Sequence, residues 1–213
     1  NISCTLHSEN VEYDFPPYFI PYLMKPLKKM RSEEISVRNF LSSVTDAMCT
    51  HGDKLRFDAK AYTMCLSGMQ SMQSSETSVR RFLACLSTSF KLNSDKAREL
   101  DWGQICLILR GMSRMDNSST EVQQILKDIS QNIRRMHEEG VNSNHYIIPI
   151  SSAMLGMRHM TNVSARNKSQ KKVLMIYQAL FEKLKENSAI VMANFNQGLG
   201  KNVLVSVMGS LTV

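Results

Sequence analysis

The stretch Gly68-Met69-Gln70-Ser71-Met72 decides how this sequence is interpreted, because it recurs twice in the same form. The other copies are Gly111-Met112-Ser113-Arg114-Met115 and Gly156-Met157-Arg158-His159-Met160. From the composition of the chain, about 0.04 matches to Gly-Met-x-x-Met are expected by chance, so three matches indicate an internal repeat. The copies begin 43 and 45 residues apart, a period that accommodates a two-helix unit.

Weaker copies extend this register towards both ends of the chain. Pro26-Leu27-Lys28-Lys29-Met30 begins 42 residues before the first full copy, and Gly198-Leu199-Gly200-Lys201-Asn202 begins 42 residues after the third. A second shared element begins seven residues after the closing methionine, at 37–41, 79–83 and 122–126. After the third full copy it is displaced by six residues, so we expect 162–170 to be a polar, basic loop that bulges from the surface.

Each unit is predicted to contain two α-helices. In the first helix, apolar residues lead into the motif at helical spacing, namely Ala61, Met64, Cys65, Gly68, Met69 and Met72. The second helix has an apolar stripe at Val79, Phe82, Leu83 and Leu86. The turns between them are rich in Ser, Thr, Asn and Asp, which favour helix N-termini, and Glu33, Glu76 and Glu121 place negative charge there. Because no long segment alternates at period two, the predicted fold is all-α.

The repeated glycine predicts close contact between neighbouring units. A glycine in a helix costs about 1 kcal/mol relative to alanine, so we expect it to permit close approach of the next helix, with methionines filling the gap. A metal or haem site is the alternative for the methionines, but helical spacing favours core packing. Units that cover one another in this way predict a right-handed α-solenoid of about five two-helix repeats of roughly 42–45 residues. We expect an N-terminal arm or cap at 1–18, the array at 19–204, and a C-terminal segment at 205–213 that fits an incomplete repeat.

The shared pattern G-[ML]-x-x-M-S-S-x-x-x-x-V-R-x-L-L resembles the degenerate helical-hairpin repeats of organellar proteins in algae and protists. These are α-solenoids of the octotricopeptide and heptatricopeptide kind, often found with an RNA-binding RAP domain. The resemblance covers 19–204, but the chain lacks a Pro-Pro-Glu-Trp-like segment and shows no recognisable RAP domain. The resemblance implies a mitochondrial setting, with the plastid as alternative, and a role in a ribosome or another ribonucleoprotein.

The composition limits the class of protein. The chain has 213 residues, of which 43% are hydrophobic and 21% are charged, and these are values of a globular protein. Its net charge of +7 favours acidic partners. No apolar run reaches the length of about 20 residues that a membrane span needs, and no signal peptide is visible. The cysteines, which are Cys4, Cys49, Cys65, Cys85 and Cys106, lack zinc-site spacing. Four of the five fall in apolar helical patterns and predict reduced, apolar side chains in a reducing compartment.

Basic residues recur at fixed positions of the repeat and predict a ridge along the stacked units. Lysine and arginine at that spacing can follow a phosphate backbone and bind RNA in a salt-dependent, largely sequence-independent way. The alternative is that they are solvated helix ends, where the helix dipole favours cations. The residues termed the basic ridge are Lys28, Lys29, Arg38, Arg80, Arg81, Arg110, Arg114, Arg158 and Lys201.

Two further groups of residues are candidates for RNA contact. Arg166, Lys168, Lys171 and Lys172 form a basic cluster on and after the inserted loop, which fits RNA, an acidic protein or simply an exposed charged segment. Aromatic residues near the starts of the first helices either stack on bases or seal the seam between repeats; they are Tyr62, Trp102 and Tyr146.

The sequence offers no catalytic motif. It contains no G-x-S-x-G elbow, no phosphate-binding glycine loop and no H-E-x-x-H, since His137-Glu138-Glu139-Gly140 lacks the second histidine. No enzyme activity, cofactor, metal site or small-molecule substrate is therefore predicted. We expect a non-catalytic RNA-binding protein, with a structural adaptor that docks protein subunits as the alternative. The apolar segment 203–213 predicts either a neighbouring subunit that covers it or a longer native chain.

Overall fold

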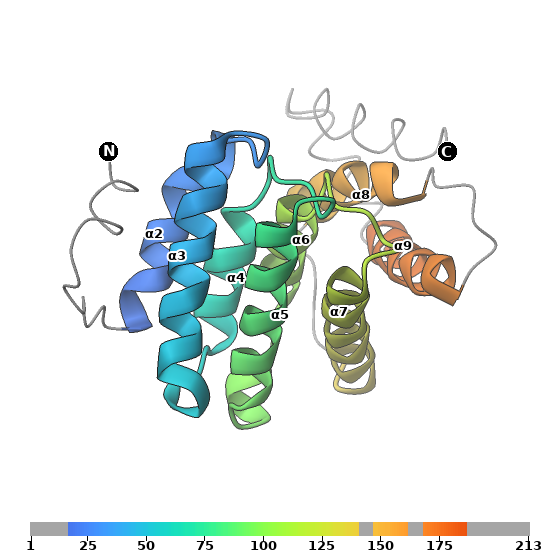
Figure 1. The fold of residues 1–213 in the computed structure, drawn as a ribbon. Coiled ribbons are helices and arrows are strands. Elements are labelled where there is room, and N and C mark those ends of the chain that lie inside the picture. Colours follow the sequence, from blue (N-terminus) through green and yellow to red (C-terminus); the bar gives the residue numbers. More distant parts are fainter. Residues whose placement is uncertain (1–16, 141–146, 162–167, 187–213) are drawn as a thin grey trace, which may run out of the picture.

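The structure, a computed structural model, describes residues 17–140, 147–161 and 168–186, and every regular element within them is a helix (Figure 1). The all-α prediction is confirmed for this part of the chain. The first helices of the four described pairs, termed the A row, are α2 (Ile20–Met24, continued by the 3-10 helix η2, Lys25–Lys29), α4 (Ala59–Ser67), α6 (Trp102–Gly111) and α8 (Ile147–Thr161). The second helices, termed the B row, are α3 (Ile35–His51), α5 (Thr77–Lys91), α7 (Thr120–Glu138) and α9 (Lys168–Glu186).

Successive pairs lie side by side in two rows. In the A row α2 contacts α4, α4 contacts α6 and α6 contacts α8; in the B row α3, α5, α7 and α9 contact one another in the same order (Figure 1). Residues 30–34, 68–76 and 112–119 connect the helices within a pair at one edge, termed the motif edge. Residues 52–58 and 92–101 connect one pair to the next at the opposite edge, termed the loop edge; they include the 3-10 helices η3 (Gly52–Lys54) and η4 (Lys96–Arg98).

The methionines of the motif belong to the core between the rows. The predicted core packing is confirmed, since none of these side chains exposes more than 2% of its surface: Met69, Met72, Met112, Met115, Met157 and Met160. The apolar stripe of the second helix is equally buried at Val79, Phe82, Leu83 and Leu86. The flexible methionine side chains fill the irregular space where an A-row helix turns towards its partner.

Two motif glycines permit backbone contact between neighbouring pairs. A Cβ atom on Gly68 would lie 2.2 Å from the Met24 carbonyl oxygen, and one on Gly111 would lie 2.1 Å from the Leu66 carbonyl oxygen. The close-approach prediction is therefore confirmed at these positions. Their place in the helix differs from the prediction, because Gly68 is the C-terminal cap of α4 and Gly111 is the last residue of α6. Only the third copy, with Gly156, lies inside a helix.

Side-chain hydrogen bonds join equivalent positions of successive pairs. The Ser32 hydroxyl accepts a hydrogen bond from the backbone N–H of Gln73 at 3.0 Å, and the Ser74 hydroxyl accepts one from Asp116 at 2.8 Å. These partners are 41 and 42 residues apart, one repeat period, and both serines are buried. The polar turns therefore bind the turn of the next pair. The sequence predicts a different role for these polar residues, namely as N-caps of the second helices. The N-cap residues of α3, α5 and α7 make no side-chain capping bond.

We expect Ser74→Ala to lower the free energy of unfolding by about 1 kcal/mol, because the Asp116 N–H loses its partner in a part-buried position. The adjacent Ser75 is exposed and serves as the matched control. Ser75→Ala should change stability by less than about 0.5 kcal/mol. Urea denaturation followed by circular dichroism measures both, and equal stability of the two variants would contradict the assigned role of Ser74.

The ends of the chain and the inserted loop are only partly described. Lys168, which begins the helix α9, lies within the predicted insertion at 162–170, so the last residues of that insertion are helical and not a bulge. Residues 1–16, 162–167 and 187–213, which include most of the predicted arm and the whole C-terminal segment, lie outside the described residues. Of the helices that the structure describes, none has the length and apolar character to cross a membrane.

Candidate nucleic-acid interface

Four ridge residues lie exposed at the motif edge. Lys28 and Lys29 end η2, Arg110 lies in the last turn of α6, and Arg114 lies in the turn that follows. Their side chains make no hydrogen bond or ion pair with any described residue. Arg31, which the repeat comparison missed because it lies just outside the motif, is also exposed at this edge. The motif edge therefore presents cations that form no ion pair with a described carboxylate.

Two ridge arginines of the B row hold the array together. Arg38 Nη1 donates a hydrogen bond to the Glu33 carbonyl oxygen at 2.7 Å and lies 3.8 Å from Glu76 Oε2 of the next pair. Arg81 Nη2 on α5 donates to Asp46 Oδ1 on α3 at 3.0 Å. Each arginine links α3 to the following pair, so part of its charge is already balanced. Their role as phosphate contacts stays a prediction, and the ion pairs were not predictable because the sequence does not show which carboxylate the neighbouring pair brings close.

The remaining predicted cations are less fully described. Arg80 on α5 is half-buried, with Nη2 3.4 Å from Thr77 Oγ1. The backbone places Arg158 in α8 and the predicted basic cluster at the start of α9, but the side chains lie outside the described part; these are Arg158, Lys168, Lys171 and Lys172. Arg166 and Lys201 lie outside the described residues altogether.

The predicted stacking aromatics are core residues. Tyr62 and Trp102 expose none of their surface, so neither ring is accessible to a base. The Tyr62 ring stacks on Phe90 of α5 with centroids 4.0 Å apart, and Trp102 meets His137 edge-on at 6.5 Å. Base stacking by these two residues is therefore wrong, and each ring contacts the second helix of its own pair. Tyr146 lies outside the described residues.

Exposed aromatic residues occur instead on the outermost pair. Tyr18 in the 3-10 helix η1 (Pro17–Phe19) exposes 66% of its surface, and Tyr22 on α2 exposes 59%. Both line a cavity of about 590 Å³, termed the loop-edge pocket, together with Lys54, Arg56 and Lys60. Their i, i+4 spacing on a short first helix is the only sequence signal for this site, and the repeat analysis did not use it.

A buried carboxyl group lies between α5 and α7. Asp128 on α7 is 7% exposed, its Oδ1 accepts a hydrogen bond from Gln124 Nε2 at 3.0 Å, and its Oδ2 has no partner in the structure. Burial raises the pKa of Asp128, while the Gln124 hydrogen bond and the Lys91 charge oppose that rise. The sequence analysis missed this residue, because it sits among charged residues of α7 that are otherwise exposed.

The pocket of about 180 Å³ beside Asp128 contains charges that pair with each other. Arg135 Nη1 lies 3.2 Å from Glu99 Oε2, and Arg98 pairs with Asp95. Raised pKa values often mark catalytic acids, but here Arg135 and Glu99 form a structural ion pair between α7 and the loop edge, and Arg98 and Asp95 pair within the loop edge. Within the described ranges, no three His, Cys, Asp or Glu side chains are grouped to bind a metal ion.

No protein-family profile, curated protein or solved structure shows significant similarity to this chain.

Proposed function

We propose that this chain is a non-catalytic RNA-binding protein built as a right-handed α-solenoid of about five two-helix repeats. The observation that carries the proposal is the set of exposed cations at the motif edge of the first and third described pairs, Lys28, Lys29, Arg110 and Arg114, none of which forms an ion pair with a described residue. A polyanion that runs along this edge meets cations on the first and the third of the four described pairs. The resemblance to organellar repeat proteins supports a mitochondrial ribosome or another ribonucleoprotein, with the plastid as the alternative setting.

The packing of the rows supports a continuous binding surface. Ser71 Oγ donates to the Lys28 carbonyl oxygen at 2.9 Å, and Ser113 Oγ lies 3.5 Å from the Gln70 carbonyl oxygen. The motif turns of consecutive pairs therefore touch, which holds the ridge positions at a fixed spacing. Preorganised cations bind a flexible anion with a smaller entropic cost than mobile ones.

We expect the double variant Arg110→Glu, Arg114→Glu to bind single-stranded RNA about ten- to a hundredfold more weakly at low salt. Each lost phosphate contact should reduce the slope of log K against log salt by about 0.7, so the slope should fall by about 1.4. Fluorescence anisotropy with a labelled oligonucleotide over a salt series measures both quantities. Unchanged affinity and slope would contradict the ridge.

The matched control is Lys96→Glu with Arg134→Glu, which changes the net charge equally at exposed positions towards the loop edge. A general effect of net charge predicts the same loss of affinity in both double variants. A specific ridge predicts that the control retains at least most of its affinity and its salt slope. Circular dichroism spectra confirm that both variants remain folded.

A structural adaptor is the second candidate, and an apolar groove favours it. The groove, of about 500 Å³, lies between α7 and α9 and is lined by Ile133, Met175, Ile176 and Ala179 together with polar residues. Leu174 and Met175 expose 58% and 57% of their surface on α9, as is common for protein-docking surfaces. An adaptor retains its partner at high salt and carries no nucleic acid when purified, whereas a ridge that binds RNA loses it as salt rises.

A further inference from the structure

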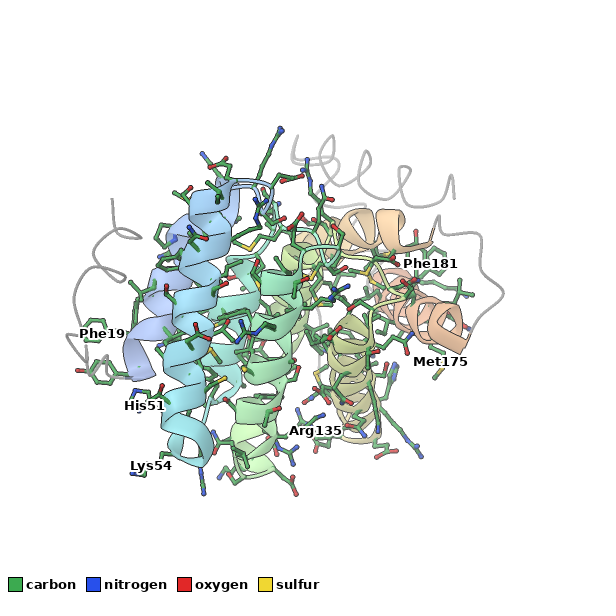
Figure 2. All side chains as sticks on the ribbon, in the orientation of Figure 1. Phe19, His51, Lys54, Arg135, Met175 and Phe181 are labelled. Atoms are coloured by element: carbon green, nitrogen blue, oxygen red, sulfur yellow. The ribbon has the colours of Figure 1, made fainter. Side chains whose placement is uncertain are left out.

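The loop-edge pocket combines exposed rings with unpaired cations. Tyr18 and Tyr22 line it from η1 and α2, and Lys54 and Arg56 line it from the connection between α3 and α4, with Lys60 on α4 itself. Figure 2 shows Lys54 at the lower edge of the array and Phe19 on the left, at the outer face of the first pair. The ring of Phe19 lies next to the ring of Tyr18. The pocket is separate from the basic ridge, because it lies at the opposite edge.

The charge of the pocket favours an anion. The three cationic side chains are exposed and have no hydrogen bond or ion pair with any residue that the structure describes. Asp58 is the acidic residue among the described lining, and its Oδ1 is engaged in accepting a hydrogen bond from the Ala61 N–H at 2.8 Å as the N-cap of α4. The carboxylate therefore caps the helix, and the three cations outnumber this one negative charge in the described lining.

The rings favour a planar partner. A tyrosine that exposes about three fifths of its surface has an accessible face, and stacking on such a face tolerates every base because each base has a π-face. The apolar floor of Pro21, Leu55, Phe57 and Met64 excludes water from one side of a bound base. A volume of about 590 Å³ lies within the range of small-ligand pockets.

We propose that the loop-edge pocket is a second RNA site, in which bases of a single strand stack on Tyr18 and Tyr22 and their phosphates pair with Lys54, Arg56 and Lys60. This inference deepens the proposed RNA function and depends on it only for the class of ligand. The ridge and the pocket use different residues, so an experiment can contradict one proposed RNA site and leave the other supported.

Fluorescence of a short oligonucleotide that contains 2-aminopurine tests stacking directly, because stacking quenches this base. We expect quenching on binding to the full chain, and a loss of affinity of about 5- to 100-fold in Tyr22→Ala. Tyr22→Phe keeps the ring and should bind within about twofold of the original chain. The triple variant Lys54→Gln, Arg56→Gln, Lys60→Gln should lower the salt slope by about 2.

Three outcomes would overturn the pocket. If the Tyr22→Ala variant binds the oligonucleotide and quenches its fluorescence as the original chain does, bases do not stack on Tyr22, regardless of the result for the ridge variant. If uridine monophosphate competes for the pocket as well as an unlabelled oligonucleotide does, the pocket is a site for free nucleotides and not for an RNA strand. Binding of polyglutamate in preference to RNA shows an acidic protein partner. If the ridge variant alone loses RNA affinity, the proposed function stands and the pocket fails.

A second inference concerns two cysteines on neighbouring B-row helices. Cys49 Sγ in the last turn of α3 lies 3.3 Å from Cys85 Sγ on α5, and Cys49 is exposed while Cys85 is half-buried. Cys65 and Cys106 are buried in the A row, as the sequence predicts. The exposure of Cys49 differs from that prediction. Burial raises the pKa of Cys85 to about 11, so Cys85 is a poor first target for an oxidant.

We infer that peroxide converts Cys49 and Cys85 into a disulfide that links the first two described pairs. The Cys49 thiolate attacks one peroxide oxygen and breaks the O–O bond, which yields a sulfenic acid at Cys49 and, with a proton, one water. The Cys85 sulfur then attacks Cys49 Sγ and expels the hydroxyl group, which leaves as a second water with the Cys85 proton. The two thiols lose two electrons, and hydrogen peroxide gains them.

Peroxide treatment of the full chain followed by alkylation, proteolysis and mass spectrometry tests this link. We expect a Cys49–Cys85 peptide that reduction splits, and a melting temperature about 10 °C higher before reduction. In Cys85→Ser, Cys49 should remain as sulfenic acid and react with dimedone. Alkylation of both thiols after treatment, or a disulfide from Cys49 to another cysteine, would overturn the inference.

Discussion

Gly111→Ala is expected to lower the free energy of unfolding by about 3 kcal/mol or more, which is at the upper end of the penalty for overpacking. A Cβ atom at this position would lie 2.1 Å from the Leu66 carbonyl oxygen, 2.7 Å from the Leu66 carbonyl carbon and 2.9 Å from the Ser67 Cα atom. All three atoms belong to the backbone, which has no rotamer that moves it aside. Relief of the clash therefore requires α4 and α6 to separate, with the loss of core contacts along both helices.

The same substitution in the third copy of the motif should have the opposite sign. A Cβ atom on Gly156 would meet the Ser113 Cβ atom at 3.4 Å, an ordinary contact, and Gly156 lies inside α8. Alanine there should raise stability by up to about 1 kcal/mol, because a helix interior favours alanine over glycine. Urea denaturation of Gly111→Ala and Gly156→Ala measures the contrast. Similar midpoints in the two variants would show that the glycines do not set the distance between neighbouring pairs.

The period of the motif was sufficient to predict the element type, the pairing of helices and the burial of the methionines. A repeat fixes which positions are equivalent, and equivalent positions pack alike when each pair covers the next. Gly156 limits this reasoning, because the sequence shows three identical motifs and only two of them carry a tight backbone contact. The difference arises from how closely the backbones of two neighbouring helices approach, and the motif alone does not determine that distance.

The exposure of several candidate residues was predictable from the sequence, whereas their ion-pair partners were not. Lys28 and Arg114 are exposed as the pattern suggests, whereas Arg38 and Arg81 bind carboxyl groups that lie 38 and 35 residues away in sequence. A helical pattern places a residue on a face of its own helix, and says nothing of what the neighbouring helix presents. Tyr62 illustrates the same limit, since it is covered by Phe90 of α5, while Tyr22 on the outermost described pair stays exposed.

Asp128→Asn is expected to raise the free energy of unfolding at neutral pH by up to about 1 kcal/mol, because it removes a buried charge while its NH2 group takes the place of the unpartnered oxygen. The amide oxygen of the substituted side chain keeps the capacity to accept the Gln124 hydrogen bond. Burial raises the pKa of Asp128 in the folded chain above its unfolded value of about 3.9. The folded chain therefore holds this proton more tightly, and the stability that Asp128 contributes is fully present below the unfolded pKa and is lost as pH rises through the folded pKa.

Because the folded chain binds this proton more tightly, the effect of Asp128→Asn on stability should depend on pH. This dependence distinguishes the burial of a charge from a general effect of the substitution. The stability difference between Asp128→Asn and the original chain should be smallest near about pH 4 and should grow towards about pH 7. Asp46 on α3 is exposed, so Asp46→Asn is the control and should shift stability by less than about 1 kcal/mol when it breaks the surface pair with Arg81. Urea midpoints measured across this pH range test the prediction. A difference that shrinks as pH rises would mean that the Asp128 carboxylate is stabilised in the folded chain, with the cations Lys91 and Arg98 outweighing its burial.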